Sequence, residues 1–314
     1  MKLRPLLITA SRWKQIQQPL YPWVVTVDRI MRHERLGNMP GPLVHLFSDY
    51  GGAHKESLYE TTAVLYMDVD NSMPWQVERL RVRQHFLPDG RRMSFKGLND
   101  VKKQQALIPF LQASDSIPGV LLVAAVHKSI KNLCWSKDVR PDWPSDRAMR
   151  HKWSPRTFER ALHVSHLAGL MVGGLSNPGQ EVFWFSDEDE LFANPTASND
   201  VGNLFTMFTS VYANHPFKQI GLGTTAIDEG DRYEEDHVAL ADLAAGSAAD
   251  MLTELAKYAG HIPTKVAIEF PGEFSRKTEI ITSWLGYSGG NLKKVMVVLE
   301  PQGKTGFSVM RLNW

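Results

Sequence analysis

The feature that most constrains the fold is an aspartate placed inside a run of small apolar residues. Residues 239–246 read Ala-Leu-Ala-Asp-Leu-Ala-Ala-Gly, a composition typical of a helix that is buried on most sides. A carboxylate in such surroundings is costly unless it is paired or holds a cation. The pattern therefore predicts a functional site at Asp242, and the alternatives are a helix cap or an ion pair with a core arginine.

Two more aspartates each end an apolar stretch typical of a β-strand. One stretch leads to Asp49, just before Gly51 and Gly52, and a second leads to Asp187. Acids far apart in sequence that meet at one edge of an α/β sheet are what a divalent-metal site requires. The alternatives are a turn role for Asp49 and a solvated acidic loop for Asp187.

Composition excludes several classes of protein. The chain has 314 residues, 43% hydrophobic and 22% charged, which is ordinary for a globular protein. The net charge of +1 means that any nucleic-acid surface must come from local patterning. Cys134 is the one cysteine, which excludes an intramolecular disulfide and a cysteine-based zinc site. No apolar run approaches the roughly 18 residues of a membrane span. We therefore expect a soluble, cytoplasmic protein without a membrane partner.

The order of apolar stretches predicts an α/β fold, a mixed sheet flanked by helices. Strands are expected at residues 44–47, 59–67, 91–96, 120–126, 181–187 and 218–222. Helices are expected at residues 100–112, from Pro155 onward, at 198–213 and around Asp242. We expect an N-terminal arm over residues 1–42, a central domain over 43–258 and a C-terminal β-rich extension over 259–314. That extension has strand candidates at 265–270, 294–300 and 306–312.

This order of strands and helices resembles that of ribonuclease H-like folds, and more narrowly domain-of-unknown-function family 3800, a bacterial group. The matching segments are Asp49-Tyr50-Gly51-Gly52, Phe95-Lys96-Gly97, the strand ending at Asp187, and Leu240-Ala241-Asp242-Leu243. Tyr50 stands where the family usually has Glu, and the acid of the second motif is absent. The resemblance covers roughly residues 43–257.

The resemblance implies metal-dependent cleavage of phosphodiester bonds, with Mg²⁺ or Mn²⁺ held in a one- or two-metal site. It implies that Asp49 bridges the ions while Asp187 and Asp242 each hold one side. Lys96 or Lys128 would steady the scissile phosphate as a point charge. The biological setting of that family points to a role in antiviral defence or in mobile genetic elements.

Further metal ligands are expected from acids next to these motifs. Glu188 or Asp189 follows the strand that ends at Asp187, and Asp236 comes shortly before Asp242. Acids in the first turn of a helix are also favoured by the helix dipole, so a structural role is the alternative for Asp236.

Residues 135–158 are rich in tryptophan and basic residues, and we expect them to be an insertion. Such side chains stack on bases and bind phosphates, so the segment is a candidate nucleic-acid surface. A tryptophan cluster packed within a loop is the alternative. The candidate residues are Lys137, Arg140, Trp143, Arg147, Arg150, Lys152 and Trp153.

Together these features predict a metal-dependent nuclease that acts on DNA or RNA. The main alternative is a catalytically inactive subunit of the same fold, which binds nucleic acid or docks a partner protein through its C-terminal extension. A hydrolase of small phosphoesters that uses the same carboxylates is the third candidate.

Overall fold

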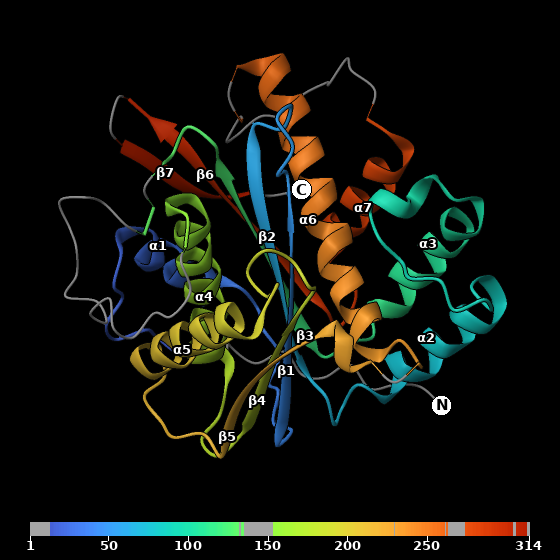
Figure 1. The fold of residues 1–314 in the computed structure, drawn as a ribbon, viewed down its shortest axis with the longest axis horizontal. Coiled ribbons are helices and arrows are strands. Elements are labelled where there is room, and N and C mark those ends of the chain that lie inside the picture. Colours follow the sequence, from blue (N-terminus) through green and yellow to red (C-terminus); the bar gives the residue numbers. More distant parts are fainter. Residues whose placement is uncertain are drawn as a thin grey trace.

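The computed structural model describes residues 13–131, 133–134, 153–228, 230–260, 262, 274–303 and 306–312. Within these residues the chain forms one seven-stranded mixed sheet with helices on both faces, as expected for an α/β protein (Figure 1).

The sheet combines an antiparallel meander with parallel strands on either side. The strands are β1 (Leu43–Gly51), β2 (Tyr59–Asp68), β3 (Gly119–His127), β4 (Glu181–Ser186), β5 (Gln219–Thr224), β6 (Lys293–Gln302) and β7 (Gly306–Leu312). Their order across the sheet is β5-β4-β1-β2-β3-β6-β7. Strands β1, β2 and β3 form the meander, whereas β4 runs parallel to β1 and β5 parallel to β4. On the other side, β6 runs parallel to β3 and β7 antiparallel to β6.

Helices cover the two faces in separate groups. On one face lie α1 (Pro22–His33), α4 (Pro155–Leu175) and α5 (Pro195–Tyr212). On the other lie α2 (Met73–Phe86), α3 (Val101–Ser114), α6 (Tyr233–Ala259) and α7 (Arg276–Gly286) (Figure 1). Short 3₁₀ turns span Lys96–Asn99 and Thr225–Ile227. Because both faces are covered, the continuous apolar run expected at residues 120–126 is the interior of β3, where residues 119–125 are buried.

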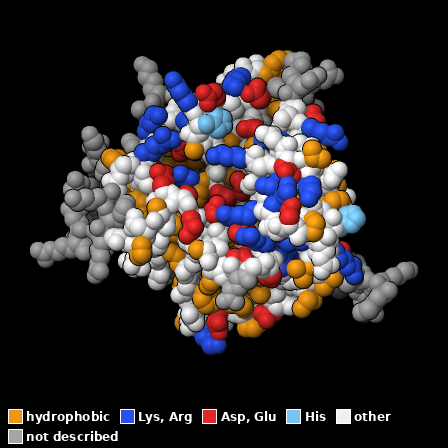
Figure 2. Space-filling view, turned by 45° about the vertical axis from the view of Figure 1, so that its right-hand side comes forward, with side chains coloured by type: hydrophobic (Ala, Val, Ile, Leu, Met, Phe, Trp, Pro, Cys, Tyr) orange, Lys and Arg blue, Asp and Glu red, His pale blue; other side chains and the backbone are white. Residues whose placement is uncertain are grey.

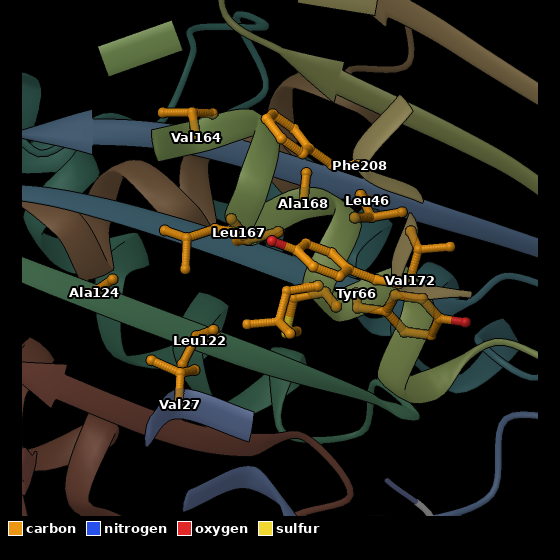
Figure 3. Close-up of a cluster of buried hydrophobic side chains, with 14 of the residues drawn as sticks. Val27, Leu46, Tyr66, Leu122, Ala124, Val164, Leu167, Ala168, Val172 and Phe208 are labelled. Atoms are coloured by element: carbon orange, nitrogen blue, oxygen red, sulfur yellow. The ribbon is translucent and has the colours of Figure 1, made fainter. Parts of the chain in front are cut away.

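The core against α4 shows how the helix and the sheet interlock. Alternate residues of β1, β2 and β3 point to this face and meet the buried side of α4, with α1 and α5 packed around it. Figure 3 shows this cluster, in which the labelled residues are Val27, Leu46, Tyr66, Leu122, Ala124, Val164, Leu167, Ala168, Val172 and Phe208. The expected long helix after Ser154 is confirmed, since the Ser154 side chain caps α4 by accepting from the backbone N–H of Thr157.

One expectation about local structure is wrong, and two helices, α2 and α7, were not expected. Residues 91–95 form a loop that leads into the first 3₁₀ turn, where a strand was expected. Helix α2 was not expected at all, because two of its four buried residues are the arginines Arg79 and Arg83. An arginine that faces inward leaves no mark in an apolar pattern.

The two ends of the chain contribute to the same core as the middle. Helix α1, from the expected N-terminal arm, buries Trp23, Val24 and Val27 against α4 and the sheet. The expected hairpin at residues 294–312 is confirmed as β6 and β7, and both strands continue the central sheet. The strand expected at 265–270 lies outside the described residues. Among the described helices, none combines the length and apolar character needed to cross a membrane.

Candidate carboxylate site

Strands β1 and β4 bring Asp49 and Asp187 to the same edge of the sheet. Ser48 pairs with Ser186 in the parallel register, so the next residue on each strand is an aspartate at the same height. Side chains alternate along a strand, and Asp49 therefore shares its face with Phe47, and Asp187 with Phe185. The rings of Phe47 and Phe185 stack 5.5 Å apart in the core beneath α6. Both carboxylates therefore lie on the α6 face.

Helix α6 carries Asp242 to the same place because small residues let it approach the sheet closely. The hydroxyl of Thr61 on β2 donates to the carbonyl oxygen of Ala245 at 2.8 Å, and Thr61 pairs with Gly51. A Cβ on Gly51 would lie 2.6 Å from that carbonyl oxygen. Only glycine therefore fits here, and the contact places Asp242, one turn earlier in the helix, beside the end of β1.

Asp49 and Asp242 form an acidic pair. Burial raises the pKa of Asp49 well above its ordinary value, and the charge of Asp242 is the next largest cause. Burial likewise raises the pKa of Asp242, and the charge of Asp187 adds to it. Oδ1 of Asp49 accepts a 2.6 Å hydrogen bond from the backbone N–H of Tyr50. A carboxylate whose pKa is raised by the charge of a neighbouring carboxylate is also a favourable place for a cation.

The loop at residues 91–95 closes the site from the side of α2. The backbone N–H of Phe95 donates to Oδ2 of Asp242 at 2.6 Å. Lys277, in the first turn of α7, holds this loop, since its Nζ donates to the carbonyl oxygen of Phe95 at 3.2 Å and lies 3.9 Å from the ring centroid. The exposed Lys96 follows, and its charge opposes the rise in the pKa of Asp242.

Asp187 is already bonded to a basic side chain. Its Oδ1 accepts from Nη2 of Arg92 at 3.0 Å and from Oγ1 of Thr225 at 3.0 Å. Burial alone would raise the pKa of Asp187, but the hydrogen bond and charge of Arg92 bring it below its ordinary value. Asp187 thus stands next to the acidic pair as an ionised carboxylate with its own counter-charge.

The other expected ligands lie further from the pair. Asp189 faces Arg160 of α4, with Oδ2 and Nη2 3.4 Å apart. Asp236 is buried on α6 between two arginines, with Oδ1 2.5 Å from Nη2 of Arg83 and Oδ2 3.0 Å from Nη1 of Arg79. Because both of its oxygens are bonded to guanidinium groups, Asp236 belongs to a structural ion-pair network, and the expected role as a metal ligand does not suit it.

Tyr50 and Lys128, two residues connected with the motifs, point to other surroundings. Tyr50 lies on the α4 face, where its ring is 4.4 Å from the guanidinium carbon of Arg160 and its hydroxyl is 3.2 Å from Oγ of Ser186. The residue that replaces the usual Glu therefore faces away from Asp49. Lys128 donates to the carbonyl oxygen of His54 at 2.6 Å.

The candidate nucleic-acid segment is mostly outside the described residues, which include neither Lys137, Arg140, Trp143, Arg147 and Arg150 nor Lys152. Trp153 is described, and it packs at the edge of the core around α4. Its indole N–H donates to Asp200 Oδ2 at 3.1 Å. For Trp153 the packed alternative therefore accounts for the residue.

The donor set around Asp49 and Asp242 consists of oxygens only, which suits Mg²⁺ or Mn²⁺ better than softer metals. No group of three or more His, Cys, Asp or Glu side chains in the described part of the chain is arranged to hold a metal ion. Two carboxylates still fit Mg²⁺, because that ion keeps several waters and commonly uses only one or two protein carboxylates plus substrate phosphates.

Basic side chains surround these acids. Figure 2 shows Lys and Arg side chains gathered among acidic ones across the middle of the face that carries α2, α3, α6 and α7. The contacts described above place Arg92, Lys96 and Lys277 on this side of the site and Arg160 on the other. The basic side chains thus favour an anionic ligand, and the acids between them favour one that binds together with a cation.

Comparison with known proteins gives no family for the chain. A scan against models of protein families finds no match, and a search of curated proteins finds none at the threshold of significance.

Sequence reasoning missed three residues of the site, Arg92, Glu235 and Lys277. Arg92 and Lys277 carry no pattern of their own, since each is one basic residue among 35. Glu235 was seen only as an acid in a first helical turn, yet it lies 3.2 Å from Nε of Arg92.

Proposed function

We propose that this chain is a metal-dependent phosphodiesterase that acts on nucleic acid, with a ribonuclease H-like arrangement of its sheet and carboxylates. The observation that carries the proposal is the acidic pair of Asp49 and Asp242. The two residues are 193 positions apart and come from a strand and a helix, yet both are largely shielded from water and the charge of Asp242 raises the pKa of Asp49. Carboxylates with raised pKa values concentrate at functional sites, which supports a bound cation here.

The strand order supports the same proposal. Along the chain, the antiparallel strands β1, β2 and β3 come first, and β4 and β5 follow before the helix that carries Asp242. The family resemblance implies strands and helices in the same order along the chain. The first strand, the end of the fourth strand and the last helix of this unit each supply one aspartate, as that resemblance also implies.

Each residue has a definite task in the proposed reaction. Asp49 and Asp242 would hold a divalent cation, and Asp187 lies next to them as a further ligand. When bound, such an ion supplies a Lewis acid and an activated water. The Phe95 backbone N–H orients the Asp242 carboxylate. Lys96 and Lys277 lie where they can hold the negative charge of a phosphate backbone.

The test is cleavage of labelled single-stranded DNA, duplex DNA and RNA with and without Mn²⁺. We expect Mn²⁺-dependent products that disappear in Asp49→Asn and Asp242→Asn, while both variants stay folded. Glu254→Gln is a matched control, because Glu254 lies on the same helix about three turns further on, pairs with Lys257 and should leave cleavage unchanged. Hydrolysis of bis(p-nitrophenyl) phosphate alone, with no polynucleotide cleaved, would instead identify a small-phosphoester hydrolase.

A second function, a non-catalytic subunit that binds nucleic acid, is favoured by one specific observation. Asp187 is already paired with Arg92, and Tyr50 faces the opposite side of the sheet, so within the described residues Asp49 and Asp242 are the acids of the site that form no ion pair with an arginine. That protein would bind an oligonucleotide equally well with and without Mn²⁺, and the Asn variants would bind like the wild type.

A further inference from the structure

One arginine lies across the side of the carboxylate site and joins two of its acids. Nη2 of Arg92 is 3.0 Å from Oδ1 of Asp187, and its Nε is 3.2 Å from Oε1 of Glu235. The Arg92 side chain is 46% exposed. The guanidinium is therefore bonded to a candidate metal ligand and is also open to solvent, where a phosphate group can reach it.

The two ends of this bridge differ in strength. The Glu235 side chain is 9% exposed, and Nη1 of Arg232 lies 2.7 Å from both of its oxygens, so Glu235 is a fixed anchor. The Asp187 side chain is 39% exposed, and an ion pair this open to water contributes little stability. If one contact breaks, the contact to Asp187 will break first.

The backbone beside Arg92 is fixed from two directions. The Phe95 N–H donates to Asp242, and Lys277 donates to the Phe95 carbonyl oxygen. A change of partner by Arg92 therefore needs a side-chain rotation only. Its guanidinium is planar and its paired N–H groups match a phosphate as well as a carboxylate.

We propose that Arg92 exchanges partners when the site is loaded: it holds Asp187 in the absence of a divalent cation and then contacts a phosphate of the nucleic-acid backbone. The cation takes over the charge of Asp187, and Glu235 keeps Nε in place while Nη2 turns to the phosphate oxygen. This inference rests on the proposed function, because it takes Asp187 as a ligand and nucleic acid as the substrate. It adds a residue that couples metal binding to substrate binding.

The experiment measures two affinities in wild type and in Arg92→Ala. Mn²⁺ affinity is measured by calorimetry, and oligonucleotide affinity by the fluorescence anisotropy of a labelled phosphorothioate oligothymidylate, which resists cleavage. We expect Arg92→Ala to bind Mn²⁺ roughly two- to fivefold more tightly, because the competing ion pair is gone. We expect it to bind the oligonucleotide roughly tenfold more weakly when Mn²⁺ is present, and as the wild type does without Mn²⁺.

Arg91→Ala is the matched control. Arg91 is the neighbouring arginine, and the bonds described for it go to Asp89 and Asp100, away from the site. It should leave both affinities unchanged, which separates a specific exchange from a general loss of positive charge.

Three results would overturn the inference. Equal Mn²⁺ and oligonucleotide affinities in wild type and Arg92→Ala would remove it and leave the proposed function intact. Weaker Mn²⁺ binding in Arg92→Ala would show that Arg92 only positions Asp187. A wild-type protein that binds no Mn²⁺ would remove the proposed function together with this inference.

Discussion

At the scale of single residues, the ionised acidic pair lowers the free energy of unfolding, and the same pair would bind the proposed cation. The pKa of Asp49 is raised above its ordinary value of 3.8, so the folded state binds this proton more tightly than the unfolded chain does. The stability that Asp49 contributes is therefore present at low pH and is lost as the pH rises from about 4 through the raised pKa.

From this sign we expect Asp49→Asn to be more stable than the wild type at pH 8, by about 1 kcal/mol or more. The gain should disappear as the pH falls toward about 4, where the wild-type carboxyl also becomes neutral. Urea unfolding at a series of pH values measures it. Adding Mn²⁺ at pH 8 should stabilise the wild type but not the variant, because the proposed ion site needs both carboxylates. An Asn variant that is less stable than the wild type at pH 8 would contradict the argument.

Asp236 gives the opposite prediction, because its two arginines make it structural. Removing one member of a buried ion-pair network leaves the others uncompensated, at a cost of about 3–5 kcal/mol. We expect Asp236→Ala to lose that much unfolding free energy in urea and to unfold at a lower temperature. Asp231→Ala is the control, since Asp231 also pairs with Arg79 but its side chain is 61% exposed, so the cost should be about 1 kcal/mol or less.

At the scale of elements, the site depends on how closely α6 crosses β1. A methyl group at Gly51 would clash with the Ala245 carbonyl oxygen and the Thr61 hydroxyl. Neither atom can move alone, because the carbonyl belongs to the backbone of α6 and the hydroxyl is hydrogen-bonded to it. We expect Gly51→Ala to cost about 1–3 kcal/mol by overpacking and to weaken Mn²⁺ binding by moving Asp242 away from Asp49. Gly37→Ala, where nothing lies within 4 Å, should change neither quantity. Normal Mn²⁺ affinity in Gly51→Ala would argue against the close crossing.

The elements also show which parts of the structure the sequence could predict. Strands β1, β2, β3 and β4 are apolar runs because they are buried, and the small residues of α6 mark its close approach to the sheet. Those same patterns located Asp49 and Asp242. The pairing of Asp187 with Arg92 could not be predicted, because it joins an exposed strand end to a loop 95 residues earlier. The loop at residues 91–95 was also not predictable. It contacts the site through the backbone N–H of Phe95 and the side chain of Arg92, and neither contact leaves a pattern in the sequence.

At the scale of the whole molecule, the C-terminal strands belong to the central sheet. Strand β6 pairs with β3 along residues 120–126, and its residues 295–300 are buried. A chain that ends at Gly290 would expose an edge of β3 that is apolar on both faces. We expect it to accumulate in the insoluble fraction, and any soluble part to lack the cooperative unfolding transition of the full chain.

The matched truncation ends at Gly303, which keeps β6 and removes only β7. None of the seven residues of β7 is buried, since five are partly exposed and two are fully exposed. Removing β7 therefore loses less buried apolar surface than removing β6 as well. We expect this shorter chain to fold with reduced stability and to keep its Mn²⁺ affinity, because the carboxylate site lies on the far side of β2 from β6. If the chain ending at Gly290 instead folds cooperatively and binds Mn²⁺, then β6 and β7 are a removable extension. The core of the protein would then consist of the five strands β5, β4, β1, β2 and β3.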